Sequence, residues 1–256
     1  LHRADPRMKI CLVIYAIVLL FVAGNFASLA LAVLYIGLGM ALSNIPWKLY
    51  ARSVKPILFL VVFTAVLNIF YGTGEPLWQF GFLRITRNGI LNCVFVSVRI
   101  VALILASSVL TFTTSPTQLT DAIERLLKPL AKLRVPVHEF AMMMTIALRF
   151  VPTLLEETDK IMAAQKARGA DMESGGITQR IRALVPVLIP LFVSAFRRAF
   201  DLATAMESRC YHGGEGRTKM KSLHFQKADW AVLASAVLWL GAFVLLQVLV
   251  PPTIRL

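Results

Sequence analysis

Five long apolar runs alternate with polar segments along the chain. They cover Ile10–Ala23, Phe26–Leu42, Ile57–Tyr71, Gly89–Phe112 and Trp230–Val250. A helix needs about 20 residues to cross a bilayer, and the first two runs are somewhat short of that length. The pattern predicts five transmembrane helices, with a tight turn at Gly24-Asn25 and a polar, aromatic-bearing loop from Gly72 to Asn88.

The stretch Thr113–Ala228 has helical periodicity in place of continuous hydrophobicity. Ser115-Pro116-Thr117-Gln118 predicts a capping box that starts a first helix, and Pro129 is expected to bend or end that helix. A second, long helix is predicted from Pro136 toward Arg168, because Gly169 follows as a common stop signal.

A third helix of this stretch is predicted from about Gln179 to Arg209. Its apolar core, Ala183–Phe196, is short, contains Pro186 and Pro190, and is flanked by arginines. We favour a buried or interfacial helix here, and a further membrane-spanning helix stays open as the alternative. The sequence as a whole predicts an all-α membrane protein with about five transmembrane helices and a domain of three long helices.

Composition supports a membrane protein. The chain is 57% hydrophobic and 16% charged, with a mean hydropathy of +0.71. Soluble domains are typically about 25% charged. The net charge of +13 is concentrated, because 17 of the 27 basic residues fall between Ser115 and Lys227 and six more lie in Arg3–Lys9 and Lys48–Lys55. Since cytoplasmic loops collect Lys and Arg, the N-terminus is expected inside the cell and the C-terminus outside. No basic-aromatic motif suggests nucleic acid.

Few side chains suggest chemistry of their own. Cys11, Cys93 and Cys210 lie far apart, so neither a disulfide framework nor a zinc site is indicated. Gly213–Thr218 lacks the Gly-Lys-[Ser/Thr] ending of a phosphate-binding loop. Arg99 lies inside an apolar run and is either a structural contact or part of a transport path. A permease that carries its own substrate and a membrane enzyme remain as rival interpretations, although no catalytic cluster is found.

The second and third helices of the middle stretch end in similar segments. Ala164–Gly169 and Ala205–Cys210 each place an arginine between small residues at the end of a long helix. One interpretation is a cation that interacts with the helix dipole, which contributes about 0.3–1 kcal/mol. The other is a guanidinium left free to enter a pocket on a partner protein, where it can bind a carboxylate through two hydrogen bonds.

Several motifs together resemble the transmembrane T component (EcfT/CbiQ-like) of energy-coupling factor (ECF) transporters. The resemblance covers almost the whole chain and is densest from Thr113 to Thr218. The motifs are Asp5-Pro6-Arg7-x-Lys9, Thr113-Thr114-Ser115-Pro116, Leu119-Thr120-Asp121-Ala122, Leu126–Leu130, Pro136-Val137, Leu148–Pro152, Glu156-Glu157, Ala164–Ala170 and Ala205–Arg209.

The resemblance implies a coupling subunit of an ABC-type transporter and no enzyme activity or cofactor in this chain. The implied partners are two ABC-type ATPase subunits, which bind the ATP, a substrate-binding membrane S component, and the lipid bilayer. The function implied is uptake of a vitamin or micronutrient through a prokaryotic plasma membrane. Residues 1–112 would form transmembrane helices 1–4, residues 113–228 a cytoplasmic coupling domain, and residues 229–256 the last transmembrane helix and the C-terminus.

The resemblance also assigns site residues. Docking to the ATPases is assigned to Ala167-Arg168-Gly169 and Ser208-Arg209-Cys210, with Cys210 in place of the glycine more often found there. Support of the coupling helices is assigned to Pro129, Arg149, Pro152, Glu156, Glu157, Gln165 and Glu207. No metal ligand and no catalytic residue is expected.

Overall fold

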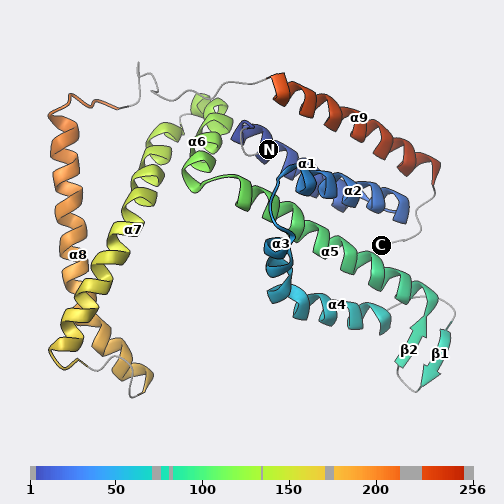
Figure 1. The fold of residues 1–256 in the computed structure, drawn as a ribbon, viewed down its shortest axis with the longest axis horizontal. Helices are drawn as coiled ribbons and strands as arrows, with labels where there is room; N and C mark the ends of the chain where they lie inside the picture. Colours follow the sequence, from blue (N-terminus) through green and yellow to red (C-terminus); the bar gives the residue numbers. More distant parts are fainter. Residues whose placement is uncertain are drawn as a thin grey trace. The chain divides into compact units, whose positions relative to one another are not determined.

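A computed structural model describes residues 4–70, 76–80, 83–133, 135–170, 176–213 and 227–250. The chain divides into two compact units. The first consists of Leu1–Ala122 and Ser222–Leu256, and the second of Ile123–Lys221. Figure 1 shows the helices of each unit.

The first unit is a bundle of the predicted apolar helices. Its elements are α1 (Pro6–Val22), α2 (Phe26–Leu42), α3 (Trp47–Val54), the 3-10 turn η1 (Lys55–Ile57), α4 (Leu58–Phe70), β1 (Pro76–Phe80), β2 (Leu83–Thr86), α5 (Arg87–Thr113), the start of α6 (Pro116–Leu127) and α9 (Lys227–Leu249). All five predicted apolar helices are present, with ends within a few residues of the expected ones. The all-α membrane fold is therefore confirmed.

The segment expected to be a loop contains a short antiparallel hairpin. Strands β1 and β2 pair with Phe80 opposite Leu83 and Pro76 opposite Thr86, and the register shifts between Pro76 and Trp78. The expectation of a plain loop across Gly72–Asn88 is wrong for these strands. Aromatic residues are common in strands, and this signal was present in the sequence.

Helix α5 lies at the centre of the first unit and contacts α1, α2, α3 and α4. Small buried residues let the helix backbones approach closely, as is common in membrane bundles. The buried core consists of Ala16, Leu19, Leu20, Ala23, Leu29, Ala32, Ile36, Met40, Tyr50, Phe95, Ala102, Ala106 and Phe243. The long-range hydrogen bonds that hold helix α9 include one from Trp239 Nε1 to the Leu31 carbonyl (3.2 Å) and one from the Tyr15 hydroxyl to the Ala236 carbonyl (3.0 Å).

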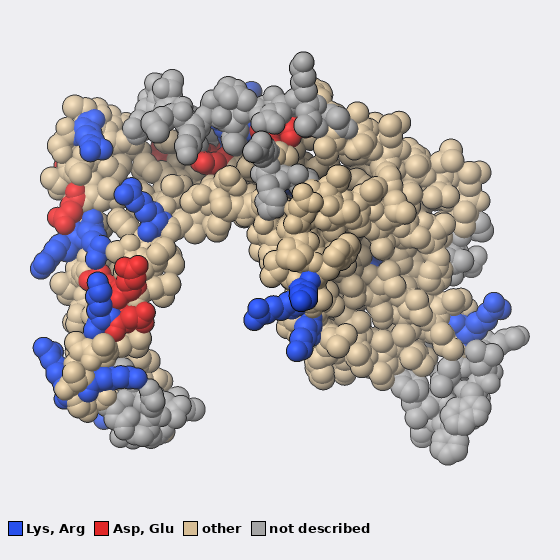
Figure 2. All heavy atoms as spheres, in the orientation of Figure 1, with Lys and Arg blue, Asp and Glu red and all other residues tan. Residues whose placement is uncertain are grey.

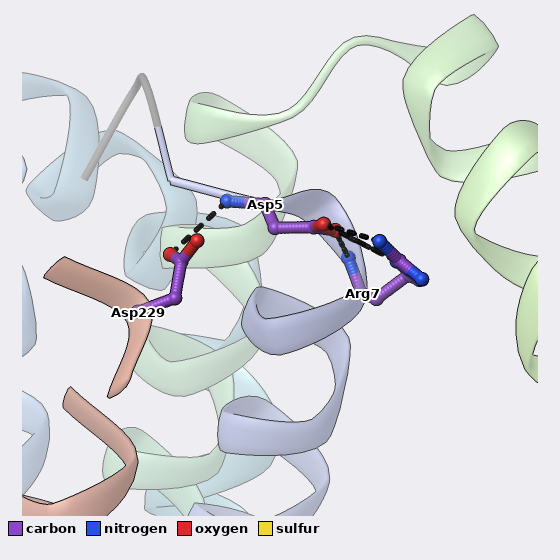
Figure 3. Close-up of polar contacts among 3 residues, drawn as sticks. All are labelled: Asp5, Arg7 and Asp229. Atoms are coloured by element: carbon purple, nitrogen blue, oxygen red, sulfur yellow. Dashed lines mark hydrogen bonds and ion pairs between the residues drawn. The ribbon is translucent and has the colours of Figure 1, made fainter. Parts of the chain in front are cut away.

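Charged residues join three helix ends at one end of this bundle. Asp5 caps α1 by accepting from the Arg7 backbone N–H at 2.9 Å, and the Arg7 guanidinium holds the same carboxylate at 2.7 Å (Figure 3). The Asp5 backbone N–H donates to Asp229 in the first turn of α9 at 3.3 Å. Lys9 Nζ donates to the carbonyl of Thr113, the last residue of α5, at 2.8 Å. The start of α1, the end of α5 and the start of α9 therefore share one face of the bundle.

Replacing Lys9 by methionine is expected to destabilise this face. The change leaves the Thr113 carbonyl without its charged donor in a site where Lys9 is only 4% exposed. Loss of a buried hydrogen bond to a charged group costs about 2–3 kcal/mol. We expect the melting temperature in detergent to fall by roughly 5 °C. Cys11→Ala, on an exposed position of the same helix, is the control and should change it little; an equal fall in both variants would contradict the assignment.

Polar side chains also hold the opposite end of the bundle. Arg99 donates to the Ala23 carbonyl at 2.6 Å, and its guanidinium carbon lies 4.6 Å from the centre of the Phe95 ring. Asn25 forms a capping box with Ser28 and donates to the Val250 carbonyl at the end of α9 at 3.0 Å. Of the two interpretations of Arg99, these contacts favour the structural one.

Length and composition identify four helices among the described residues that are able to cross a membrane. They are Trp47–Ile69, Arg87–Thr113, Ile181–Glu207 and Val232–Leu249, and Phe26–Leu42 is a shorter apolar helix. The first of these is not straight, since α3 runs across the direction of α4 in Figure 1 and the 3-10 turn η1, which contains Pro56, separates them. A proline removes one backbone donor and favours such a bend.

The second unit contains the end of α6, the 3-10 segment η2 (Lys128–Leu133), α7 (Val137–Ala167) and α8 (Ile177–Glu207). The predicted capping box is confirmed, because Ser115 N–H donates to Gln118 Oε1 and Gln118 N–H to Ser115 Oγ, both at 3.3 Å. Pro129 lies in η2 and follows the end of α6, as expected. The sequence predicted three long helices in this stretch. Helices α7 and α8 have 31 residues each and are long, whereas α6 has only 12.

Candidate coupling site: two arginine-capped helix ends

Helix α7 ends in a complete Schellman motif. The Gly169 N–H donates to the Lys166 carbonyl at 3.0 Å, and the Ala170 N–H donates to the Gln165 carbonyl at 3.0 Å. Gly169 has a φ of +88°, a left-handed conformation that glycine adopts without steric cost. This geometry makes Arg168 the C-cap residue of α7.

Helix α8 ends in the same motif. The Cys210 N–H donates to the Glu207 carbonyl at 2.9 Å, and the Tyr211 N–H donates to the Met206 carbonyl at 3.1 Å. Cys210 occupies the position of Gly169 and has a φ of +55°. Arg209 therefore directly precedes the left-handed residue at the end of α8, as Arg168 does at the end of α7. The similarity that the sequence suggested extends to the backbone hydrogen bonds.

Opposite stability changes are expected from matched substitutions at the two caps. A side chain in the left-handed region costs roughly 1–2 kcal/mol. Cys210→Gly should therefore strengthen the last turn of α8 and slow hydrogen exchange at the Tyr211 amide about fivefold or more. Gly169→Ala introduces the same cost and should speed exchange at the Ala170 amide by a similar factor. Changes of the same sign in both variants would show that the left-handed positions do not govern the caps.

Both arginines are exposed, and so are the small residues beside them. The exposed residues are Ala167, Arg168 and Gly169 at the end of α7, and Ser208, Arg209 and Cys210 at the end of α8. Within the part of the chain that the structure describes, neither guanidinium has a hydrogen bond or an ion pair. An arginine in this setting keeps all five N–H donors available for a planar anionic partner.

The two helices cross in an antiparallel pair that is held by a polar contact (Figure 1). Glu157 of α7 accepts from Arg198 of α8 at 2.8 Å and from the hydroxyl of Ser194. The hydrogen bond from Ser194 and the nearby Arg198 guanidinium hold the pKa of the Glu157 carboxyl below its usual range. The lowered pKa means that the contact stabilises the pair at neutral pH and is lost only when the pH falls through that lowered pKa.

Gln165 makes a second contact across the crossing. Its side-chain amide donates to the Pro186 carbonyl at 3.4 Å. In a regular helix that carbonyl would accept from the residue four positions later, which here is Pro190 and has no N–H. Gln165 thus supplies a donor that the α8 backbone lacks, and it lies three residues before the α7 cap.

The crossing places the two arginines far apart. Gln165 lies beside Pro186, in the first third of α8, and Arg209 follows 23 residues later in the chain, just beyond the end of that helix. A rise of 1.5 Å per residue makes this separation roughly 35 Å. The pair therefore presents two similar arginine ends at widely separated points.

The other predicted support residues are more dispersed. Pro152 lies inside α7 without ending it, and Arg149 and Glu156 are exposed on that helix. Glu207 is exposed, and its carbonyl accepts in the α8 cap. The sequence reasoning missed Ser194 and Arg198, which complete the Glu157 contact, and Asp229, which joins α9 to α1. An acid directly before the last apolar run was the signal available for Asp229.

The chain is similar to known proteins over most of its length. The CbiQ family model, described as "Cobalt transport protein", matches residues 1–220. The chain is 50% identical over 247 residues to the energy-coupling factor transporter transmembrane protein EcfT of Ruminiclostridium cellulolyticum, covering 96% of this chain and 92% of the relative. It is 51% identical to EcfT of Acidaminococcus fermentans (97% and 92% covered) and 46% identical to EcfT of Bacillus subtilis (92% and 89% covered). The chain therefore belongs to the CbiQ/EcfT family, the transmembrane components of energy-coupling factor transporters.

Proposed function

We propose that this chain couples ATP hydrolysis by two partner ATPase subunits to the movement of a substrate-binding membrane subunit. The chain itself performs no hydrolysis in this proposal, and the nutrient, a vitamin or micronutrient, is bound by the substrate-binding subunit. The observation that carries the proposal is the pair of equivalent caps, each with an exposed arginine that has no partner in the described chain.

In the proposed mechanism each arginine enters a groove on one ATPase. The small neighbours Ala167, Gly169 and Ser208 leave room for a close approach, and the guanidinium fork suits a carboxylate bidentately. Two sites on one crossed pair suit two copies of a similar partner. When the ATPases close on ATP, they would carry the two helix ends toward one another.

The crossing is proposed to transmit this movement. Two contacts link α7 to α8 at the proposed pivot for a change in the angle between the helices. They join Glu157 to Ser194 and Arg198, and Gln165 to Pro186. Prolines 152, 186 and 190 remove backbone hydrogen bonds from both helices and make bending there less costly. The apolar faces of the pair would then tilt the membrane subunit that rests against them.

The charge distribution and the bundle support a cytoplasmic location for this pair. The end of α5 and the start of α9 share one face with the start of α1, so the intervening chain leaves and re-enters the bundle on the same side. Basic residues dominate the intervening stretch, as expected of the cytoplasmic side. Helix α8 is long and apolar enough overall to cross a membrane. Its uninterrupted apolar segment between Arg182 and Arg197, however, has only 14 residues, or roughly 21 Å, and is shorter than the ~30 Å hydrocarbon core, which supports an interfacial position in this proposal.

Purification of the tagged full chain from its host membranes tests the proposal. Mass spectrometry should find two ATPase subunits and a small membrane subunit bound to the chain, and substrate should bind only when the small subunit is present. Substrate binding by the isolated chain would favour a permease instead. Uptake that persists when the ATPases are deleted would also contradict the proposal.

A further inference from the structure

Helix α3 lies along the end face of the first unit that contains Lys9 and Thr113. Tyr50 anchors it, with a 2% exposed side chain whose hydroxyl lies 2.8 Å from Ser43 Oγ at the end of α2. The Tyr50 ring also packs edge-on against Phe112, 5.7 Å between centroids, next to the last residue of α5. Figure 1 shows α3 running across the direction of α4 and α5. This orientation suits a helix that lies at a membrane surface.

Three cations form one stripe on α3 and the turn that follows it. Lys48, Arg52 and Lys55 are spaced at i, i+4 and i+7, and all three are exposed. At about 100° per residue they fall within an arc of roughly 60°. That arc is centred opposite Tyr50, so the residue that fixes α3 to the bundle also turns the cations outward.

The stripe has no counter-charge in the described chain. Lys48, Arg52 and Lys55 form no ion pair or hydrogen bond through their side chains with any described residue. The sequence contains no acidic residue between Pro6 and Gly74. In Figure 2, Lys and Arg atoms gather over α3 without Asp or Glu atoms beside them. Three like charges along one stripe repel one another, and a bound anion would offset that repulsion.

The neighbouring side chains indicate which anion fits. Trp47 is 66% exposed and Leu49 39% exposed on the same helix. Tryptophan beside lysine and arginine is typical of helices at the boundary between headgroups and acyl chains. An acidic protein surface would match the charges alone, whereas a lipid matches the charges and the exposed indole together.

We propose that the Lys48–Arg52–Lys55 stripe binds the headgroups of anionic phospholipids. This site is separate from the arginine caps and does not depend on the proposed coupling function. Its physical role is to neutralise the stripe and to fix the depth of the bundle in the leaflet that carries the basic loops.

Spin-labelled lipids in vesicles that contain the full chain test the proposal. The vesicles consist of phosphatidylcholine with a trace of either spin-labelled phosphatidylglycerol or spin-labelled phosphatidylcholine, and electron paramagnetic resonance measures the fraction held by the protein. A cation near the surface changes lipid affinity by about fivefold. The wild-type chain should therefore hold phosphatidylglycerol at least about fivefold more strongly, and 1 M salt should reduce this preference through screening.

The variant K48Q/R52Q/K55Q should lose the preference. The matched control K160Q/R182Q/R197Q removes three exposed cations from the second unit and should keep it. The charge-preserving variant K48R/K55R should also keep it, which separates loss of charge from misfolding. The proposal is overturned if the glutamine variant retains full preference. It is also overturned if that variant loses only protein partners while its lipid preference is unchanged, because the stripe would then be a protein contact.

Discussion

Replacement of Arg168 and Arg209 together by alanine is expected to release both ATPase subunits and to stop nutrient uptake, while the chain remains inserted in the membrane. Truncating one side of a buried, hydrogen-bonded charge pair at an interface costs about 2–5 kcal/mol. This corresponds to a loss of roughly 30-fold or more in affinity at each end. The measurement is ATPase co-purification together with radiolabelled nutrient uptake by cells, and we expect uptake below about a tenth of the wild-type rate.

Two comparison variants show which property of the arginines matters. Arg182→Ala with Arg197→Ala removes two exposed arginines from the body of α8 and should leave at least half of the uptake. Arg168→Lys with Arg209→Lys keeps the charge at both helix ends but loses the planar fork. If the arginines acted only on the helix dipole, the lysine variant would match the wild type, and the alanine variant would still bind the ATPases.

Replacement of Glu157 by alanine is expected to uncouple hydrolysis from uptake. The change removes the acceptor shared by Ser194 and Arg198 and leaves both caps intact. ATPase co-purification should therefore be normal, whereas the number of nutrient molecules taken up per ATP should fall. Residues that carry coupling between sites change it by roughly three- to thirty-fold. Purified complex in vesicles allows both rates to be measured on one sample.

The neighbouring Glu156 offers the matched control. It is exposed one residue away on α7 and lies outside the crossing contact. Glu156→Ala should keep the wild-type ratio of uptake to hydrolysis. If Glu157→Ala kept that ratio as well, or lost the ATPases altogether, the crossing would not be the element that transmits movement.

Local signals predicted most of the elements. The apolar runs from Phe26 to Leu42 and from Trp230 to Val250 are continuous and bounded by polar residues, so their helices could be located within a few residues. Ser115 and Gln118 formed a capping box because that motif depends only on residues three positions apart. Gly169 indicated the end of α7 for the same reason, since its left-handed conformation is a local property.

Contacts between distant residues could not be predicted in this way. Lys9 bonds to Thr113 across 104 positions, and nothing in either segment specifies the other. Gln165 reaches Pro186 only because the two long helices cross there. Cys210 gave no sequence signal of its left-handed conformation, since cysteine rarely adopts it. These features depend on how the helices pack in three dimensions, and that packing cannot be derived from local patterns in a single sequence.

The caps themselves can be tested for contact with the ATPases by photo-crosslinking. A photoreactive amino acid is placed at the exposed positions Ala167 or Ser208, beside each arginine, and at the exposed positions Glu139 or Ala199 as controls. After irradiation of the purified complex, Ala167 and Ser208 should each form a crosslink to an ATPase subunit, and the controls should form few or none. Crosslinks from both caps to lipid or to the substrate-binding subunit alone, with no ATPase product, would contradict the account.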